Sequence, residues 1–146
     1  MSDHWSGCIY TRPIDGNTHI LLTRTSLDNE WSMPGGKQEG NESPEETLIR
    51  EVNEEIICNA VPVLLILKVK EPQHLRYIFD IEPTSEIRET ALVQFFPLIR
   101  LPQNLRERHR QILCSLYRDY CKYERKFLKM QNEHLKVAQQ PLSLAA

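Results

Sequence analysis

Short apolar runs, bounded by glycine, proline and polar residues, divide the first two thirds of the chain into segments that are typical of strands. Asp15-Gly16-Asn17 lies between the first two runs and is a turn signal, so we expect those runs to pair as a hairpin. The third run is rich in Val, Leu and Ile and predicts a buried strand. The strands are expected over residues 6–11, 19–23, 60–69, 74–81 and 91–98.

Two segments carry helix signals. Ser43 can cap a helix, Pro44 suits the first helical position, and Glu46 can complete a capping box, so a helix is expected over about residues 44–57. Residues 103–133 contain neither glycine nor proline, and apolar residues recur there at spacings of three and four, which predicts a long amphipathic C-terminal helix. The apolar positions of that helix are Ile112, Leu116, Tyr120, Tyr123, Phe127 and Met130.

The order of these elements predicts an α+β fold in which a mixed β-sheet lies between helices. The length of 146 residues suits one domain, which we place at residues 1–136 with the helix 103–133 included. Residues 137–146 are expected to form a flexible tail. A helix of this length outruns so small a domain, so residues 120–135 are expected to form a homodimer contact or to dock as an extension.

Composition and charge narrow the class of protein. No apolar stretch approaches the ~20 residues that span a bilayer, so no membrane partner is expected. No secretory signal precedes the first strand, and the four cysteines form no close pair, so we expect a cytoplasmic protein with reduced thiols. Residues 1–100 carry 9 basic and 16 acidic side chains, whereas residues 101–146 carry 9 basic and 4 acidic. The basic C-terminal part fits an ordinary solvated helix surface, so nucleic acid is not an expected partner.

Three glutamates of the first predicted helix share one face. At about 100° per residue, with Glu51 at 0°, Glu54 falls at roughly 300° and Glu55 at roughly 40°. The neighbouring stripe is apolar and can dock on a sheet, which leaves the carboxylates along its edge. The residues of this stripe are Leu48, Ile49, Val52 and Ile56.

Carboxylates gathered in this way repel one another unless a cation lies between them. Oxygen ligands at helical spacing suit Mg²⁺, with Mn²⁺ as a possible substitute. A solvated acidic helix face is the alternative for a bare Glu-x-x-Glu-Glu string. Here Gly35-Gly36 gives the backbone a close approach, and Arg50 can neutralise and orient the carboxylates, so the sequence favours a metal site.

The stretch 36–58 resembles the Nudix box, and the preceding Trp31–Gly36 resembles the lead-in that is common in that family. The residues that match the box are Gly36, Glu42, Arg50, Glu51, Val52, Glu54 and Glu55. One position departs from the pattern, because the family's glycine near the end of the box is Ile57 here. A β-branched residue resists the left-handed conformation that this glycine adopts, so we expect the helix to end later, near Asn59.

The resemblance implies a Nudix-type α/β/α sandwich and a MutT-like enzyme. Members of the family hydrolyse, with Mg²⁺, a nucleoside diphosphate that is linked to another moiety. By position, Glu51, Glu54 and Glu55 match the family's metal-binding glutamates, and Glu51 and Glu54 are also expected to act in catalysis. Glu42 is expected to support the metal site, the Gly35 carbonyl is a further possible ligand, and Arg50 has an orienting role.

Outside the metal set, a carboxylate is expected in the loop before the last strand, where Glu89 is preferred to Glu86. Arg24, Gly36 and Tyr77 are the candidate substrate-binding residues. The expected substrate is a small nucleotide such as a nucleoside triphosphate. The alternatives are ADP-ribose or a nucleotide sugar, and, in another class, a non-catalytic Nudix-fold regulator that binds nucleotides.

Overall fold

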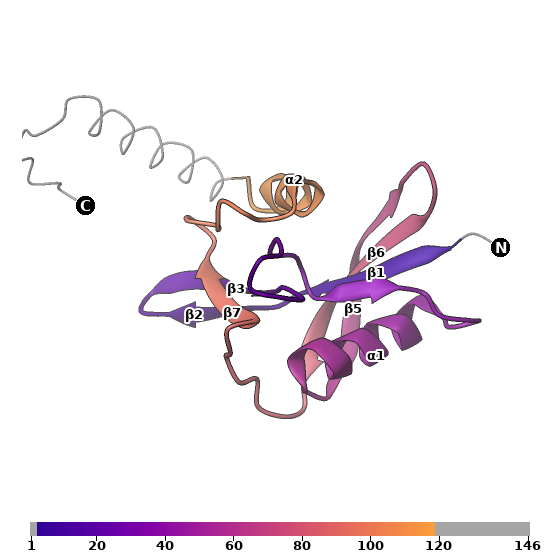
Figure 1. Ribbon diagram of the computed structural model, residues 1–146, viewed down its shortest axis with the longest axis horizontal. Helices are drawn as coiled ribbons and strands as arrows, with labels where there is room; N and C mark the ends of the chain where they lie inside the picture. Colours follow the sequence, from indigo (N-terminus) through magenta and orange to yellow (C-terminus); the bar gives the residue numbers. More distant parts are fainter. Residues whose placement is uncertain (1–2, 119–146) are drawn as a thin grey trace, which may run out of the picture.

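The computed structural model describes residues 3–118, which form seven strands and two helices (Figure 1). The elements are β1 (His4–Ile9), β2 (Thr11–Ile14), β3 (Asn17–Thr23), β4 (Gly35–Lys37), α1 (Pro44–Ile56), β5 (Ala60–Lys70), β6 (Leu75–Pro83), β7 (Val93–Pro97) and α2 (Glu107–Leu116).

The strands form two sheets. The first is mixed, in the order β4-β1-β6-β5. Strands β1 and β6 are parallel, whereas the β4–β1 and β6–β5 pairs are antiparallel. The second is antiparallel, in the order β2-β3-β7. Helices α1 and α2 lie on opposite sides of the mixed sheet, so the predicted α+β sandwich is confirmed (Figure 1).

The predicted first strand, residues 6–11, is two strands in the structure. The strand conformation is interrupted at Tyr10, and β1 and β2 on its two sides belong to different sheets. The expected hairpin is present but joins β2 to β3 through Asp15 and Gly16, whose φ angles are 50° and 81°. Two positive φ angles in a two-residue turn match the twist of paired strands. The turn was therefore predicted correctly, whereas the exchange between sheets at Tyr10 was not.

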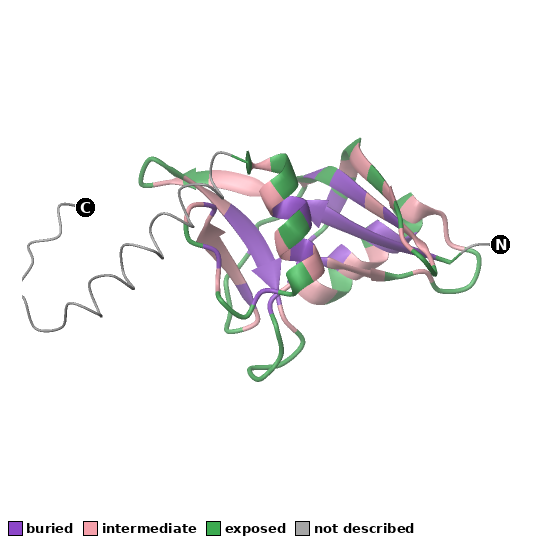
Figure 2. Ribbon diagram, turned by 90° about the horizontal axis from the view of Figure 1, so that it is seen from above, coloured by how far each residue is buried: buried purple, intermediate pink, exposed green. Residues whose placement is uncertain are grey.

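Apolar side chains form two core clusters, one on each side of the mixed sheet. Figure 2 shows the buried residues that lie along the strands and on the helices. On the α1 side, Leu48 and Val52 of the helix pack with Phe79 of β6. On the α2 side, Ile112 and Leu113 pack with Ile78 of the same strand. The alternation along β6 sends successive side chains to opposite faces, so both helices are fixed to the same strand.

Strand β5 is exposed, and the prediction of a buried strand was wrong. It lies at the edge of the mixed sheet, and after Ala60 neither core cluster includes its apolar residues from Val61 to Leu65. Ile66 and Leu67 are only partly buried. A continuous apolar run predicts burial on both faces, but the helices cover the central strands and leave this edge open. The exposed apolar residues of β5 are Val61, Val63, Leu64 and Leu65.

Helix α1 begins as predicted and ends earlier than predicted. Ser43 accepts from the Glu46 N–H, and the Glu46 carboxylate accepts from the Ser43 N–H, which completes the capping box. The C-cap is Ile57, with φ 55° and ψ 48°, so the expected extension toward Asn59 does not occur. The Ile57 N–H donates to the Asn53 carbonyl, and this bond closes the last turn despite the unfavourable residue.

We expect Ile57→Gly to stabilise the protein by about 1 kcal/mol. A left-handed conformation costs an L-residue about 1–2 kcal/mol, and part of the gain is offset by the entropy of glycine in the unfolded chain. The Ile57 side chain is 85% exposed, so the substitution removes little packing. Urea unfolding measures the change. Ile49→Gly in the middle of α1 is the matched control and should destabilise the protein, and a destabilising Ile57→Gly would contradict the argument.

Helix α2 begins at Glu107, not at residue 103 as predicted. The backbone before it is bound elsewhere, because the Trp31 N–H donates to the Asn104 carbonyl and the Arg106 N–H donates to the Trp31 carbonyl. These bonds hold residues 104–106 against the loop before β4. Helix α2 ends at Leu116, with Tyr117 as its C-cap. The predictions for a helix as far as residue 133, a contact over 120–135 and a tail from 137 otherwise concern residues outside the described part.

The cysteines of the described residues match the prediction of reduced thiols only in part. Cys8 and Cys58 are free and buried, and burial raises the pKa of the Cys8 thiol. Cys114 is disulfide-bonded, so the prediction that all the cysteines are reduced is wrong for this residue.

Within residues 3–118, no helix has the length and apolar character that a membrane span requires.

Candidate active site

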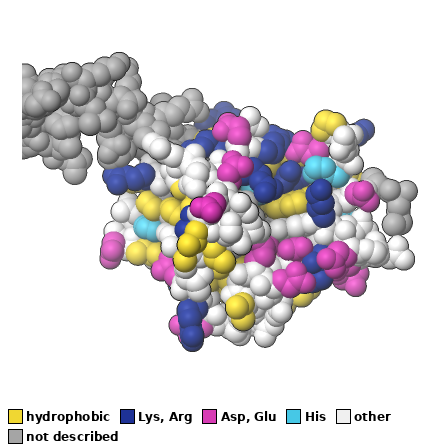
Figure 3. Space-filling view, in the orientation of Figure 1, with side chains coloured by type: hydrophobic (Ala, Val, Ile, Leu, Met, Phe, Trp, Pro, Cys, Tyr) yellow, Lys and Arg dark blue, Asp and Glu magenta, His cyan; other side chains and the backbone are white. Residues whose placement is uncertain are grey.

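The box residues lie where β4 passes the second half of α1, and acidic side chains gather there around a basic one (Figures 1 and 3). The strand begins at Gly35, and the helix begins at Pro44 after a short connection. Leu48 and Val52 anchor the buried face of α1 on the sheet. The face with the glutamates is thereby held beside β4, as the helical spacing predicts.

Arg50 is the centre of the carboxylate cluster. Its Nε and Nη2 donate to the two oxygens of Glu42 at 2.7 and 3.1 Å, a bidentate pair. Its Nη1 donates to Glu51 at 2.9 Å and to Glu54 at 3.4 Å. A further bond from Nη2 to the Lys37 carbonyl ties the guanidinium to β4 at 2.9 Å. The bonds from Arg50 lower the pKa of Glu42 to about 2, so Glu42 is ionised whenever the protein is folded near neutral pH.

Glu55 is the most deeply placed of the box carboxylates. Its Oε1 accepts from the Gly35 N–H at 2.8 Å, and its Oε2 accepts from the Thr23 hydroxyl at 3.1 Å. Burial raises the pKa of Glu55 to about 8, and the nearby Glu51 adds to this rise. Both hydrogen-bond partners are neutral, so the charge of an ionised Glu55 is not balanced by them.

Gly36 allows the close approach of β4 to α1. A Cβ atom at this position would lie 2.2 Å from Oε1 of Glu51. Gly35 is also constrained, because a Cβ there would lie 2.4 Å from the Ser6 carbonyl of β1. The sequence prediction that these two glycines permit a close backbone approach is confirmed.

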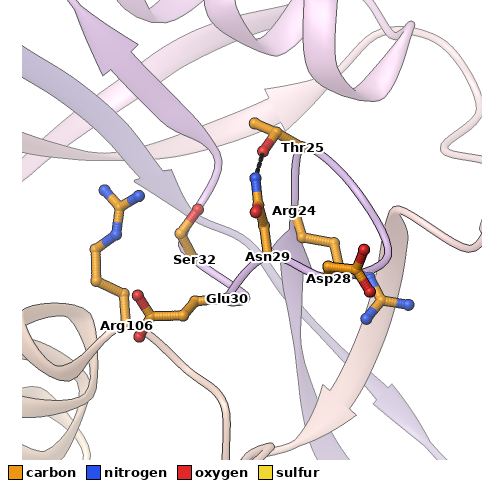
Figure 4. Close-up of a pocket in the computed structure, with 7 residues that line it drawn as sticks. All are labelled: Arg24, Thr25, Asp28, Asn29, Glu30, Ser32 and Arg106. Atoms are coloured by element: carbon orange, nitrogen blue, oxygen red, sulfur yellow. Dashed lines mark hydrogen bonds between the residues drawn. The ribbon is translucent and has the colours of Figure 1, made fainter.

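The loop after β3 and Arg106 line a polar pocket of about 440 Å³ (Figure 4). Arg24 is fixed in it by bonds to the carbonyls of Ala91 and Leu27, and its guanidinium lies 4.3 Å from the ring centre of Trp31. The Ser32 N–H donates to the Thr23 carbonyl, which joins the pocket to the residue that binds Glu55. The lining residues are Arg24, Thr25, Asp28, Asn29, Glu30, Ser32 and Arg106.

Comparison with known protein families identifies the family to which this chain belongs. The family model described as the NUDIX domain matches residues 9–116, which is most of the chain. The chain belongs to the Nudix family. The match runs from the end of β1 to the end of α2, so it covers the fold as well as the box.

Individual relatives match over shorter segments. An 8-oxo-dGTP diphosphatase from Proteus vulgaris is 62% identical over 46 residues, which cover 29% of this chain and 41% of that protein. An RNA pyrophosphohydrolase from Sulfurovum sp. (strain NBC37-1) is 42% identical over 45 residues, which cover 31% of this chain and 29% of that protein. The chain therefore matches less than half the length of these curated relatives.

The fold resembles solved Nudix structures over a much longer stretch. A Nudix hydrolase family member from Chromobacterium violaceum superposes with a TM-score of 0.63 and 17% identity, covering 92% of this chain and 98% of that one. At this identity the likeness shows the fold alone.

The donor set of this Nudix box fits a hard divalent cation, although its carboxylates are not arranged around a common point. Within residues 3–118, no group of three or more His, Cys, Asp or Glu side chains is placed as a ready metal cluster. Glu51 and Glu54 are instead turned toward Arg50. The partly buried Glu55 beside Glu51 is the feature that fits a cation, because two adjacent carboxylates shielded from water need positive charge between them to ionise together.

We expect Mg²⁺ binding at pH 7 to release about one proton, because Glu55 must ionise to act as a ligand. The raised pKa of Glu55 also makes the stability of the metal-free protein depend on pH. Since the folded pKa is raised, the stability gained from neutral Glu55 is present below the unfolded pKa of about 4.3 and is lost as the pH rises through about 8. Calorimetry in two buffers of different protonation enthalpy measures the release. Glu55→Gln should remove it, and Mg²⁺ binding by the wild type without proton release would contradict the account.

Two predicted site residues lie apart from the carboxylate cluster. The ring of Tyr77 packs edge-on against His4, with ring centres 5.8 Å apart, and Tyr77 is not one of the pocket-lining residues. Glu89 accepts from the Phe95 N–H at 2.8 Å and so is bound to β7. Arg24, by contrast, lies in the pocket next to Thr23, where a substrate could reach it.

Several residues of the site have no counterpart in the sequence predictions. Thr23 ends a predicted strand and gave no signal of its contact with Glu55. Thr47 could have been found, because it lies one helical turn before Glu51 and shares the arc of the glutamates. His109 is fully buried, and its Nδ1 accepts from the Met33 N–H at 2.9 Å, so its role is structural. Burial lowers the pKa of His109 to about 3, so it is neutral when it accepts this bond.

Proposed function

We propose that this protein hydrolyses, with Mg²⁺, a nucleoside diphosphate linked to another moiety. The observation that carries the proposal is the cluster in which Arg50 donates hydrogen bonds to three carboxylates, beside the partly buried Glu55 at the start of β4. A non-catalytic Nudix-fold regulator would not need this complete set of acidic residues. The activity belongs to the family, and its assignment to this chain is our proposal.

The residues that would hold Mg²⁺ are Glu51, Glu54 and Glu55, with Glu42 in support and the Gly35 carbonyl as a further ligand. When bound, the ion supplies charge neutralisation at the phosphate oxygens and acidifies water. Arg50 orients the carboxylates and limits their repulsion. The Glu54 side chain is 57% exposed, against 16% for Glu51, so Glu54 is the carboxylate that we assign to accept a proton from water at its Oε atoms.

The proposed substrate is a small nucleotide such as a nucleoside triphosphate. The pocket beside Thr23 offers the Arg24 and Arg106 guanidinium groups to acceptor atoms and the Asp28 and Glu30 carboxylates to donor atoms. A nucleobase or sugar presents both kinds of atom. The named activity of the Proteus vulgaris relative, on 8-oxo-dGTP, supports a nucleoside triphosphate for this chain.

The cellular location that we propose is the cytoplasm. The buried free thiols of Cys8 and Cys58 agree with a reducing compartment, whereas the disulfide at Cys114 is an observation against it.

A substrate panel tests the proposal. Nucleoside triphosphates, including 8-oxo-dGTP, are compared with ADP-ribose, nucleotide sugars, dinucleoside polyphosphates and capped RNA, each with Mg²⁺, and the products are identified by mass spectrometry. We expect cleavage within the diphosphate, with the highest kcat/KM for a nucleoside triphosphate. A higher kcat/KM for ADP-ribose or a nucleotide sugar would replace the proposed substrate, and no cleavage of any compound by folded protein would contradict the enzyme assignment.

A further inference from the structure

A buried histidine on β1 contacts the catalytic helix. His4 is 6% exposed, and its Nε2 lies 2.8 Å from Oγ1 of Thr47, a fully buried residue of α1. The two residues are 43 positions apart in the sequence, so this bond connects the sheet to the helix. Neither belongs to the set of acidic residues that defines the Nudix box.

The bond continues from Thr47 into the carboxylate cluster. The Thr47 hydroxyl donates to Oε1 of Glu42 at 3.0 Å. A hydroxyl has one proton, so Thr47 accepts from His4, and the His4 proton therefore sits on Nε2. Oε1 of Glu42 also accepts from Nη2 of Arg50 at 3.1 Å, while Oε2 accepts from Nε of Arg50 at 2.7 Å. The chain of donors thus runs from His4 through Thr47 to the carboxylate that pairs with Arg50.

Thr47 is the third group that donates to Glu42, after Arg50 and the Glu39 N–H, and it is the donor that comes from the buried face of α1. Glu42 precedes the helix, in the turn where its own carboxylate caps the Glu39 N–H at 2.9 Å, so the α1 backbone does not fix its rotamer. Arg50 also bonds to Glu51 and Glu54, and a Glu42 carboxylate that could swing would let the guanidinium shift with it. The Thr47 hydroxyl approaches from the buried side and holds Glu42 Oε1 in place.

We propose that His4 and Thr47 are positioning residues for the candidate active site, which act by fixing Glu42 and, through it, Arg50. The proposal rests on the proposed function. It assigns a catalytic consequence to two buried side chains whose simplest role is to tie β1 to α1. A purely structural tie would change stability alone, whereas a positioning role changes turnover in protein that is fully folded.

The test compares Thr47→Val with Thr47→Ser. Valine keeps the shape of threonine and removes the hydroxyl, and serine keeps the hydroxyl. We expect Thr47→Val to lower kcat by roughly 10-fold or more with little change in KM, the effect typical of residues that orient ligating groups, and Thr47→Ser to restore most of the loss. A Thr47→Val variant with wild-type kcat, or a loss that serine does not rescue, would overturn the proposal.

A second pair covers the case in which Thr47→Val does not fold. His4→Leu removes the donor and should lower kcat in the same direction, whereas His4→Gln keeps an N–H at the end of the side chain and should retain more activity. Ser6→Ala is the matched control, because the buried Ser6 hydroxyl on the same strand has no hydrogen-bond partner within the described residues. A loss of kcat in Ser6→Ala equal to that in His4→Leu would mean that any polar deletion in β1 has this effect, and it would overturn the proposal.

A readout without substrate separates this proposal from the proposed function. The Nε–H group of Arg50 donates to Glu42, so its ¹⁵N NMR signal reports on that pair directly. We expect the signal to be protected from exchange in the wild type and in Thr47→Ser, and to be broadened or shifted in Thr47→Val. If no diphosphate is hydrolysed, the proposed function fails, and this signal still decides whether the hydroxyl positions Arg50. An unchanged signal in Thr47→Val would overturn the positioning role.

Discussion

Glu54→Gln and Glu55→Gln will each lower kcat by about 10²-fold or more. With Mg²⁺ bound and Glu55 ionised, each substitution removes one negative charge and keeps the shape of the side chain, so the loss reports on electrostatics at the reacting phosphates. For Glu55 the amide also replaces a group that accepts from both Gly35 and Thr23, and only one amide atom can accept. Steady-state kinetics with the preferred substrate measures both variants.

The control for this pair is Glu45→Gln. Glu45 lies in the first turn of the same helix, is exposed, and is not the residue that completes the capping box. Glu45→Gln should change kcat and the midpoint of unfolding very little. Equal losses in all three variants would mean that the helix was damaged, and the argument from the carboxylate cluster would then fail.

Gly36→Ala will lower activity by at least about 10-fold, because the added methyl group displaces Glu51, a proposed metal ligand. The new Cβ would lie 2.2 Å from Oε1 of Glu51, closer than two such atoms can approach. The carboxylate must move, and its bond to Arg50 moves with it. Mg²⁺ affinity, measured by calorimetry, should fall together with kcat.

Gly40→Ala is the matched control for Gly36→Ala. Its added Cβ meets no atom within 4 Å, but its φ of 55° is unfavourable for alanine. We expect it to lose about 1 kcal/mol of stability and to keep its kcat. Activity of Gly36→Ala close to the wild type would show that Glu51 does not need its present position.

The parts of the fold that follow from local chemistry were predictable. The N-terminus of α1 depends on Ser43, Pro44 and Glu46, which are neighbours in the chain, and the β2–β3 turn depends on Asp15 and Gly16. The exposure of β5 and the start of α2 at Glu107 depend on elements distant in sequence. An apolar run in the sequence does not show whether a helix covers it. A helical pattern likewise does not show that the backbone groups of Asn104 and Arg106 are hydrogen-bonded to Trp31.

The end of α1 shows how a local rule can fail. The rule that a β-branched residue avoids the left-handed conformation predicted an extension beyond Ile57, yet Ile57 adopts that conformation. Packing of Ile56 and Cys58 in the core on the α1 side fixes the chain on both sides of Ile57. The fold therefore imposes the conformation, and the residue carries the strain.

The candidate site was predictable to the extent that it lies on one helix. Glu51, Glu54 and Glu55 follow from helical spacing, and Arg50 follows from its place among them. Glu42 joins the cluster through bonds to Arg50 and Thr47 that spacing alone does not give. His4 and Thr23 come from strands, and only the tertiary structure brings them to the helix.

The central claim is that the carboxylate cluster acts through a divalent ion on a diphosphate. The most direct measurement is turnover of the best substrate from the panel, first with Mg²⁺, then with excess EDTA, and then after Mg²⁺ is restored. We predict complete loss with EDTA and full recovery with Mg²⁺, while the protein stays folded throughout. Undiminished turnover in excess EDTA would contradict the account.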